Sequence, residues 1–405
     1  MSKNGPQEIN PGFFLKIPTG SQSEMVNVID LSDLDIGNIS NLDMAVESQL
    51  KKLELLRSEV RKLTYVPVDP VGDYNFVAYK AIDGGRMKIN FNPLEIDFVN
   101  VSDSNDMTKM QFAFPRGNDL DEDDIKEMLN GISSANPLMS DFVQSLGRSS
   151  INEISEVFKD PDALMEIGEW ACIFERIRGS QDPTLVIKDG LLRTKKIKHE
   201  LIVKMIDQIE RNKKMTKLVG VSKTSSILTL TSSSLAIEKK FPANGIGYVK
   251  IPRELELTAY TWSGKGLLGE KKMKRLFYAF GDLYIAKLSP NSNLLVTVEI
   301  PKRLGDDESQ DKDIYSPVEV SEIMGHLARN SRNSYPILGY PQTLVRAHEA
   351  AARVGFSASI VSDRVKDIIL GKLDEDGKSY MRDADMVDEY VNKGVLGGTK
   401  NVEWG

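Results

Sequence analysis

Residues 184–195, with the sequence TLVIKDGLLRTK, contain the pattern around which the rest of the chain is organised. The run 184–187 is apolar and rich in β-branched residues, and residues 179–183 just before it include Gly and Pro. This combination predicts a short buried strand. Asp189 and Gly190 end the strand, and α/β proteins place catalytic groups at the carboxyl ends of such strands. Asp189 is therefore a candidate catalytic residue.

A second copy of this pattern lies upstream. Residues 76–82 (FVAYKAI) form an apolar run that leads into Asp83, Gly84 and Gly85. Because glycine has no Cβ atom and turns sharply, we expect the chain to reverse at the two glycines. Residues 86–92 would then return as the second strand of a hairpin. Two strands that each deliver an Asp-Gly pair bring two carboxylates together at one end of a sheet.

The remaining apolar runs show either strand or helix spacing. We expect further strands at residues 96–101, 110–114, 218–221, 246–251, 258–261, 278–288 and 294–300. We expect helices at residues 43–62, 122–129, 149–177 (one or two helices), 197–212, 318–328, 343–354 and 362–371. The predicted fold class is α/β, with a mixed sheet flanked by helices and with N-terminal and C-terminal helical additions. The predicted domains are an arm and amphipathic helix in 1–72, the α/β domain in 73–355, and a helix and tail in 356–405.

Composition is typical of a soluble globular protein. The chain has 405 residues, of which 40% are hydrophobic and 27% are charged. No apolar run is long enough for a transmembrane helix, and the first residues lack the apolar segment of a secretory signal. The single cysteine, Cys172, excludes an internal disulfide and fits a reducing compartment. We therefore expect a cytoplasmic protein without a membrane segment.

The candidate chemistry is that of a hard metal ion. Three histidines and one cysteine argue against a closed zinc site, whereas carboxylates suit Mg²⁺ or Mn²⁺. The helix predicted at the end of 149–177 adds Glu166, Glu169 and Glu175 to the two aspartates. Two strand-end aspartates with a helix carboxylate are typical of phosphodiester hydrolysis by two ions about 4 Å apart.

Charge along the chain is uneven. The net charge is −7, so the protein as a whole does not attract nucleic acid. Two segments are nevertheless basic, 193–217 and 265–275, and the second contains Lys271, Lys272 and Lys274. Such segments either line a channel for phosphates or are solvated helix faces. The sequence leaves both interpretations open.

Five short motifs occur in a fixed order. They are AIDGG at 81–85, Glu169-Trp170, VIKDGLLR at 186–193, VGVSK at 219–223, and GYP at 339–341 followed by Ala347-His348. Together they span about residues 76–355 and resemble the NurA family of nucleases. The resemblance implies a PIWI/RNase H-like α/β fold over 73–355. It also implies a Mn²⁺- or Mg²⁺-dependent DNA endo- or exonuclease, a homodimer, and a partnership with the hexameric HerA translocase. The implied setting is DNA-end processing in repair or antiviral defence.

The resemblance also assigns roles to residues of this chain. The metal ligands would be Asp83, Asp189 and a helix glutamate. His348 would either bind the metal or contact the scissile phosphate. Glu169 fits the motif, and Glu175, which lies nearer the strand, is the alternative. The remaining assignments are contacts to DNA: Arg193 and Lys223 to phosphate, and Tyr340 stacked on a base or shaping the site. Independently of the resemblance, Lys271 and Lys272 of the basic segment 265–275 are candidate contacts to DNA.

Two other functional classes remain open on sequence grounds. An actin-like ATPase or sugar kinase also carries an early strand with Asp-x-Gly and a later Asp-Gly that face a metal nucleotide. Against this class, Arg86, Met87 and Lys88 follow the first motif, with no Ser or Thr to hold phosphate. The third class is an inactive RNase H-like scaffold that only binds a partner. Such a scaffold would lack a carboxylate, and here every candidate carboxylate is present.

Overall fold

A computed structural model defines the fold. It describes residues 42–70, 77–91, 94–105, 107–116, 121–155, 157–194, 196–262, 280–303 and 311–355, with scattered residues between 360 and 379. The chain divides into two units, Met1–Lys52 and Leu53–Gly405, and the division falls within helix α1 (Leu42–Lys62). The predicted domain boundaries at residues 72 and 355 adjoin stretches outside the described residues, and they stay predictions. Half of the residues of the helix predicted at 362–371 also lie outside them.

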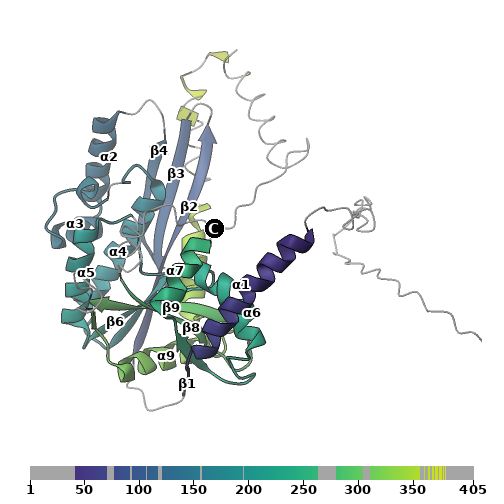
Figure 1. Cartoon of the computed structure of the whole chain (residues 1–405). Helices are drawn as coiled ribbons and strands as arrows, with labels where there is room; N and C mark the ends of the chain where they lie inside the picture. Colours follow the sequence, from purple (N-terminus) through teal and green to yellow (C-terminus); the bar gives the residue numbers. More distant parts are fainter. Residues whose placement is uncertain are drawn as a thin grey trace, which may run out of the picture. The chain divides into compact units, whose positions relative to one another are not determined.

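One mixed ten-stranded sheet forms the centre of the protein, which confirms the predicted α/β class (Figure 1). Strand β3 (Leu94–Asp103) pairs antiparallel with β2 (Ala78–Phe91) on one side and with β4 (Met107–Arg116) on the other. On the other side of β2, β5 (Thr184–Asp189) and β6 (Thr216–Ser222) run parallel to it. Three antiparallel strands followed by two parallel ones give the predicted RNase H-like core.

The other half of the sheet continues from β6 with antiparallel pairs. The order runs β6, β9, β8, β7, β1, and the short strand β10 also pairs with β9. The strand bounds are β9 (Leu295–Arg303), β8 (Gly281–Lys287), β7 (Gly247–Lys250), β1 (Tyr65–Pro67) and β10 (Lys312–Asp313). The turn residues 290–293 connect β8 to β9, as predicted.

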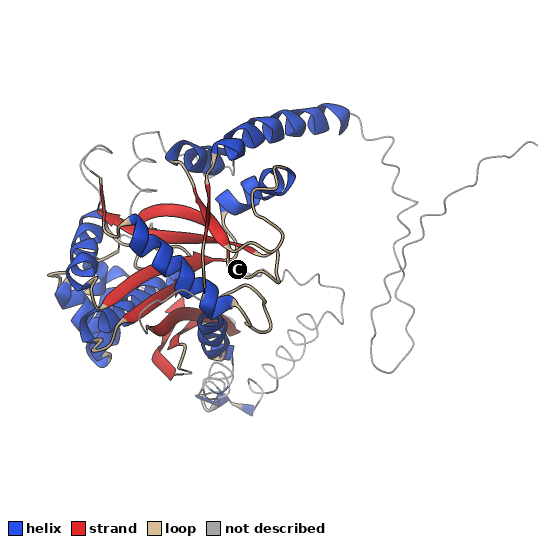
Figure 2. Cartoon of the chain, turned by 90° about the horizontal axis from the view of Figure 1, so that it is seen from below, coloured by secondary structure: helices blue, strands red, loops and turns tan. Residues whose placement is uncertain are grey.

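Helices lie on both faces of the sheet (Figure 2). The first group, drawn together at one side of Figure 1, is α2 (Glu122–Ala135), α3 (Pro137–Ser145), α4 (Pro161–Gly179) and α5 (His199–Asn212). The others are α6 (Ser226–Ile237), α7 (Arg253–Trp262), α9 (Pro317–Ser331) and α10 (Gln342–Ala352). Residues 258–261, predicted as a strand, belong to α7, and α3 was not among the predicted helices.

Local sequence explains where α4 and α9 begin. The Asp160 carboxylate accepts a hydrogen bond from the Asp162 backbone N–H, and Pro161 fills the first turn, where no N–H is needed. Ser316 and Glu319 form a reciprocal capping box at the start of α9. Further along α4, Trp170 is fully buried and stacks on Phe280 with 4.7 Å between ring centroids. This packing holds α4 against the sheet.

Strand β2 contradicts the predicted turn at Gly84 and Gly85. It continues through both glycines to Phe91, and only then does the chain reverse into β3. A Cβ atom at Gly84 would lie 2.5 Å from Met165 Cγ of α4. One at Gly85 would lie 2.3 Å from the backbone oxygen of Ala351 in α10. The glycines therefore let α4 and α10 approach β2 from opposite faces.

Within the described residues, no helix combines the length and the apolar character needed to span a membrane. This finding agrees with the absence of a long apolar run in the sequence.

Candidate metal centre

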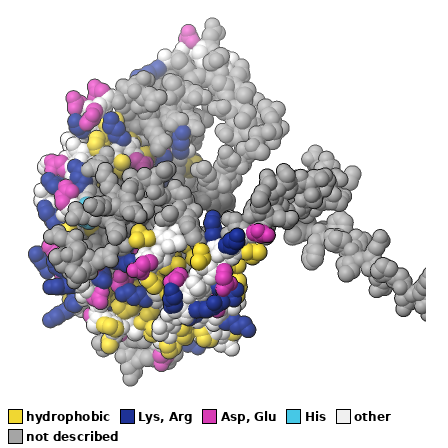
Figure 3. Space-filling view, in the orientation of Figure 1, with side chains coloured by type: hydrophobic (Ala, Val, Ile, Leu, Met, Phe, Trp, Pro, Cys, Tyr) yellow, Lys and Arg dark blue, Asp and Glu magenta, His cyan; other side chains and the backbone are white. Residues whose placement is uncertain are grey.

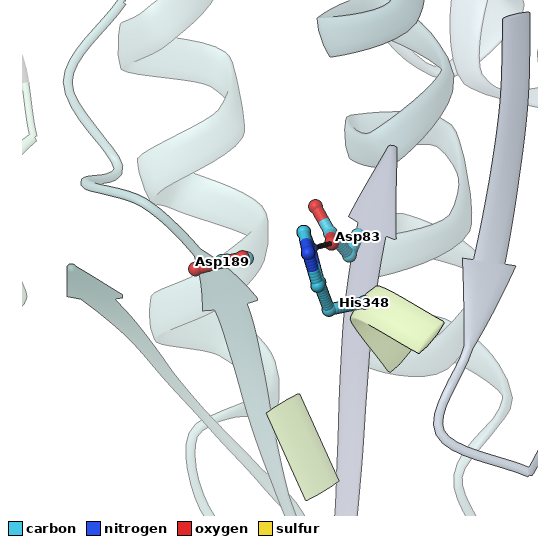
Figure 4. A group of neighbouring side chains, drawn as sticks. All are labelled: Asp83, Asp189 and His348. Atoms are coloured by element: carbon cyan, nitrogen blue, oxygen red, sulfur yellow. Dashed lines mark hydrogen bonds and ion pairs between the residues drawn. The ribbon is translucent and has the colours of Figure 1, made fainter. Parts of the chain in front are cut away.

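The register between β2 and β5 sets Asp83 beside Asp189. The two strands are parallel, and their last paired residues are Ile82 and Lys188. Asp83 and Asp189 are the next residue in each strand, so their carboxylates occupy neighbouring positions (Figure 4). The predicted meeting of two aspartates at adjacent strands is thus found, although only β5 ends there.

His348 of α10 completes a group of three. One ligand atom from each of Asp83, Asp189 and His348 lies within 4.8 Å of the others. His348 Nδ1 is 2.9 Å from Asp83 Oδ2, the contact drawn as a dashed line in Figure 4. The His348 side chain is 57% exposed, whereas Asp83 is buried. The group therefore sits at the floor of a site that opens to solvent.

Asp189 is held by two hydrogen bonds. The Tyr340 hydroxyl donates to Asp189 Oδ1 at 2.6 Å, and the Gly190 backbone N–H donates to the same oxygen at 3.0 Å. Gly190 has φ of 81°, a left-handed conformation that glycine adopts without strain, so the predicted turn at this position is present. Burial and the nearby Asp83 charge raise the pKa of Asp189, while the Tyr340 hydrogen bond lowers it.

Asp83 and His348 support each other electrostatically. The Gly84 backbone N–H donates to Asp83 Oδ1 at 2.8 Å, which leaves Oδ2 facing His348. The hydrogen bond with Asp83 raises the pKa of His348 above its ordinary value, although partial burial opposes this. A negative charge near the imidazole favours its protonated form. The contact between Asp83 and His348 is therefore an ion pair whenever the imidazole is protonated.

The three residues fit a divalent cation. Two aspartates share one site, and partial burial already disfavours the charge on Asp189. A cation between them would remove the repulsion between like charges. Two carboxylate oxygens and one imidazole nitrogen suit Mn²⁺, and the carboxylates suit Mg²⁺.

A polar cavity of about 270 Å³ extends from these aspartates towards α4. Its lining combines acidic and basic side chains with the ends of β5 and β6. The charged lining residues are Asp83, Asp162, Glu166, Glu169, Lys188, Asp189, Lys196 and Lys223. The predicted helix glutamate, Glu169, is among them, and Glu175 is not. Glu175 instead lies 3.2 Å from Arg176.

Lys188 is a site residue that our sequence reasoning missed. Its Nζ lies 2.7 Å from Glu169 Oε2 and donates to the Asp189 backbone oxygen at 3.0 Å. Both partners of the pair are buried, and burial raises the pKa of Glu169 to about 7, although Lys188 opposes the rise. A signal was present in the sequence, because a lysine inside a fully buried strand needs a partner.

Lys223 lies where phosphate contact was predicted. It follows β6, lines the cavity, and its Nζ is 5.5 Å from the centroid of the Tyr340 ring. Tyr340 itself is only 1% exposed and points its hydroxyl at Asp189. Of the two roles expected for Tyr340, its burial favours shaping the site over stacking on a base.

Arg193 was predicted to contact a phosphate, but its side chain pairs with two carboxylates of the protein. Its side chain is 8% exposed, and its guanidinium contacts Glu256 of α7 and Glu299 of β9. Its backbone N–H also donates to Glu299 at 2.9 Å. Because two buried carboxylates hold it, Arg193 belongs to the packing below the site rather than to its surface. Lys271 and Lys272 lie outside the described residues.

Comparison with known proteins adds independent information. The family model described as the NurA domain matches residues 81–353. A search of curated proteins finds no match. Among solved structures, the NurA nuclease from Sulfolobus solfataricus is similar at 15% identity and a TM-score of 0.40, over 80% of this chain and 95% of that one. A NurA structure bound to dAMP and manganese is similar at 9% identity and a TM-score of 0.38, over 79% and 94% of the two chains.

The family match covers more than half of the chain and includes all five sequence motifs. It contains the three residues of the candidate metal centre, Asp83, Asp189 and His348. The chain belongs to the NurA family.

Proposed function

We propose that this protein is a divalent-metal-dependent DNA nuclease. The observation that carries the proposal is the convergence of Asp83, Asp189 and His348 from three separate elements, with the two aspartates lining a polar cavity. Family membership and the sequence motifs favour nuclease chemistry over the ATPase, kinase and scaffold alternatives.

Metal binding, orientation of a carboxylate and contact with phosphate fall to different residues in this proposal. Asp83, Asp189 and His348 would hold a Mn²⁺ or Mg²⁺ ion. A bound ion supplies Lewis-acid stabilisation of the phosphate and a more acidic water. Tyr340 orients Asp189 through its hydrogen bond, which favours the ionised carboxylate. Lys223, at the rim of the cavity, would pair with a phosphate oxygen of the DNA backbone.

The predicted second ion conflicts with the pairing of Glu169 with Lys188. A second ion would need the Glu169 carboxylate, which is the nearest predicted ligand on α4. That carboxylate already forms a charge-assisted hydrogen bond with Lys188. The described ligand group therefore accounts for one ion without rearrangement.

DNA binding must rest on local features of the surface. On the face shown in Figure 3, the described basic and acidic side chains are interspersed, in keeping with the net charge of −7. We propose that Lys223 and the segment 265–275, with Lys271 and Lys272, contact the DNA backbone. Contacts of this type position the duplex but carry no base information.

The family resemblance extends the proposal to partners. We propose a homodimer that works with a HerA-like hexameric ATPase in DNA-end processing, either in repair or in antiviral defence. Helix α1, which was predicted as an amphipathic helix, is the proposed contact surface. Light scattering tests the dimer, and co-purification with a HerA-like ATPase from the same source tests the partner.

Cleavage of labelled DNA tests the proposed activity. Purified protein is incubated with single- and double-stranded DNA in Mn²⁺, in Mg²⁺ and in EDTA. We expect cleavage only with a metal, and loss of cleavage in Asp83→Asn and Asp189→Asn. Asp123→Asn, at the exposed start of α2, is the matched control and should cleave normally. Wild-type protein that leaves DNA intact, yet gains thermal stability from ATP, would favour the ATPase class instead.

A further inference from the structure

A buried ammonium group occupies the α4 side of the candidate metal centre. Lys188 is 6% exposed and lines the same cavity as Asp83 and Asp189. Since strand side chains alternate between faces, Lys188 reaches towards Glu169 on α4, while the neighbouring Asp189 contacts Tyr340. The site thus has acidic groups on both sides of β5 and a cation on one of them.

The Lys188 ammonium occupies the Glu169 carboxylate that was predicted to bind metal. The ammonium lies 2.7 Å from Glu169 Oε2 and 3.0 Å from the Asp189 backbone oxygen. An ammonium has three N–H donors, and the third has no acceptor among the described residues. A divalent cation at Glu169 would have to displace this buried ammonium or lie next to it, and like charges repel strongly in such a site.

The charged side chains that line the cavity also disfavour a divalent cation at Glu169. Five carboxylates line it, from Asp83, Asp162, Glu166, Glu169 and Asp189, against the three lysines Lys188, Lys196 and Lys223. Of these lysines, Lys188 is buried and within hydrogen-bonding distance of a carboxylate that was predicted to bind metal. It therefore supplies a fixed positive charge at the place where a second ion would be needed.

We propose that Lys188 takes the place of a second divalent cation, so that the centre binds one ion, at Asp83, Asp189 and His348, beside a permanent ammonium. This inference rests on the proposed nuclease function and replaces the two-ion expectation drawn from the sequence. Lys188 acts as a positioning residue towards Glu169 and Asp189, and its charge faces the cavity.

The number of Mn²⁺ ions bound per chain tests this inference without any nuclease assay. Isothermal titration calorimetry with Mn²⁺ alone should give one ion for the wild type. Glu169→Gln should also bind one ion, because Glu169 is not a ligand. Lys188→Met should bind two, since it frees Glu169, and electron paramagnetic resonance should then show a spin-coupled Mn²⁺ pair.

A matched control separates the local effect from a general one. Lys250→Met also removes a lysine from a largely buried carboxylate, that of Asp282, which lies 2.6 Å from Lys250 Nζ outside the metal centre and keeps Arg253 and Lys302 as partners. Its ion count should stay at one.

Two ions in the wild type, or a folded Lys188→Met that still binds one, would overturn the role of Lys188 while leaving the proposed nuclease intact. No bound ion in the wild type would overturn the proposed metal centre itself. If Lys188→Met fails to fold, the ion counts of the wild type and of Glu169→Gln decide. A two-ion centre predicts two ions in the wild type and one in Glu169→Gln, whereas the proposed centre predicts one ion in each.

Discussion

The Tyr340 hydroxyl donates a 2.6 Å hydrogen bond to Asp189 Oδ1. Tyr340 precedes α10 and Asp189 ends β5, so this bond joins the element that carries His348 to the strand that carries an aspartate. It also opposes the effect of burial on the carboxylate, because a donor favours the ionised form.

Replacing Tyr340 by Phe should therefore weaken metal binding without unfolding the protein. The phenyl ring fills the same buried space, and only the donor is lost. Loss of a group that orients a metal ligand typically costs about 10–100-fold in affinity. The pKa of Asp189 should rise further, so cleavage should fail at a higher pH than in the wild type. Calorimetry with Mn²⁺ and a pH profile of cleavage measure both effects. An unchanged profile would show that the hydrogen bond has no influence on Asp189.

His348 should make metal binding depend on pH. The pKa of His348 is raised above its ordinary value by the hydrogen bond with Asp83, and only the neutral imidazole binds a cation. Mn²⁺ affinity should therefore increase as pH rises from about 6 to about 8, and binding should release a proton. His348→Asn should bind more weakly and with a flatter pH dependence. Calorimetry in buffers of different ionisation enthalpy counts the proton, and equal proton release by the variant would contradict the role of His348.

Gly85→Ala should destabilise the fold and the site together. The new Cβ would lie 2.3 Å from the Ala351 backbone oxygen, so α10, which carries His348, must move. Overpacking of this kind costs roughly 1–3 kcal/mol. Gly131→Ala is the control, since Gly131 lies in α2 with nothing within 4 Å of a new Cβ, and it should gain up to about 1 kcal/mol. Urea denaturation compares the two, and equal stabilities would show that α10 does not press on β2.

Arg193→Met should reduce stability through Glu256 and Glu299. Removing one partner of a buried ion pair leaves uncompensated charge and costs roughly 3–5 kcal/mol. Burial raises the pKa of Glu256 while Arg193 lowers it, so the variant raises it further. A carboxyl with a raised pKa in the folded state loses stability as pH rises, because the folded state then holds the extra proton. The loss should therefore be smaller at acid pH.

The exposed pair Lys62–Glu59 provides the comparison for Arg193. Lys62→Met should change the free energy of unfolding by less than about 1 kcal/mol at any pH. If Arg193→Met were equally mild but weakened DNA binding, the sequence-based assignment of Arg193 to phosphate would be restored.

Reversing Lys271, Lys272 and Lys274 to Glu should weaken DNA binding about equally for any sequence. Each lysine that neutralises a phosphate releases counterions, so the variant should also show a smaller dependence of affinity on salt. Binding is measured at two salt concentrations in Ca²⁺, which suppresses cleavage. An unchanged affinity and salt dependence would place these lysines on a solvated face or at a protein partner.

The sequence alone determined the α/β class and the pairing of Asp83 with Asp189. Short β-branched runs followed by Asp-Gly are local signals, and the ends of adjacent parallel strands meet at one edge whatever surrounds them. The caps of α4 and the turn at Gly190 were likewise predictable, because they depend on the residue and its immediate neighbours.

Only the tertiary structure decided what Gly84, Gly85, Lys188 and Arg193 do. Gly-Gly predicts a turn locally, yet here two helices press on β2 from opposite faces, and a sequence does not show which helix packs where. The sequence alone assigned Arg193 to a phosphate and gave Lys188 no role. Their partners, Glu169, Glu256 and Glu299, lie far along the chain, and burial makes such charges pair with one another instead of facing solvent.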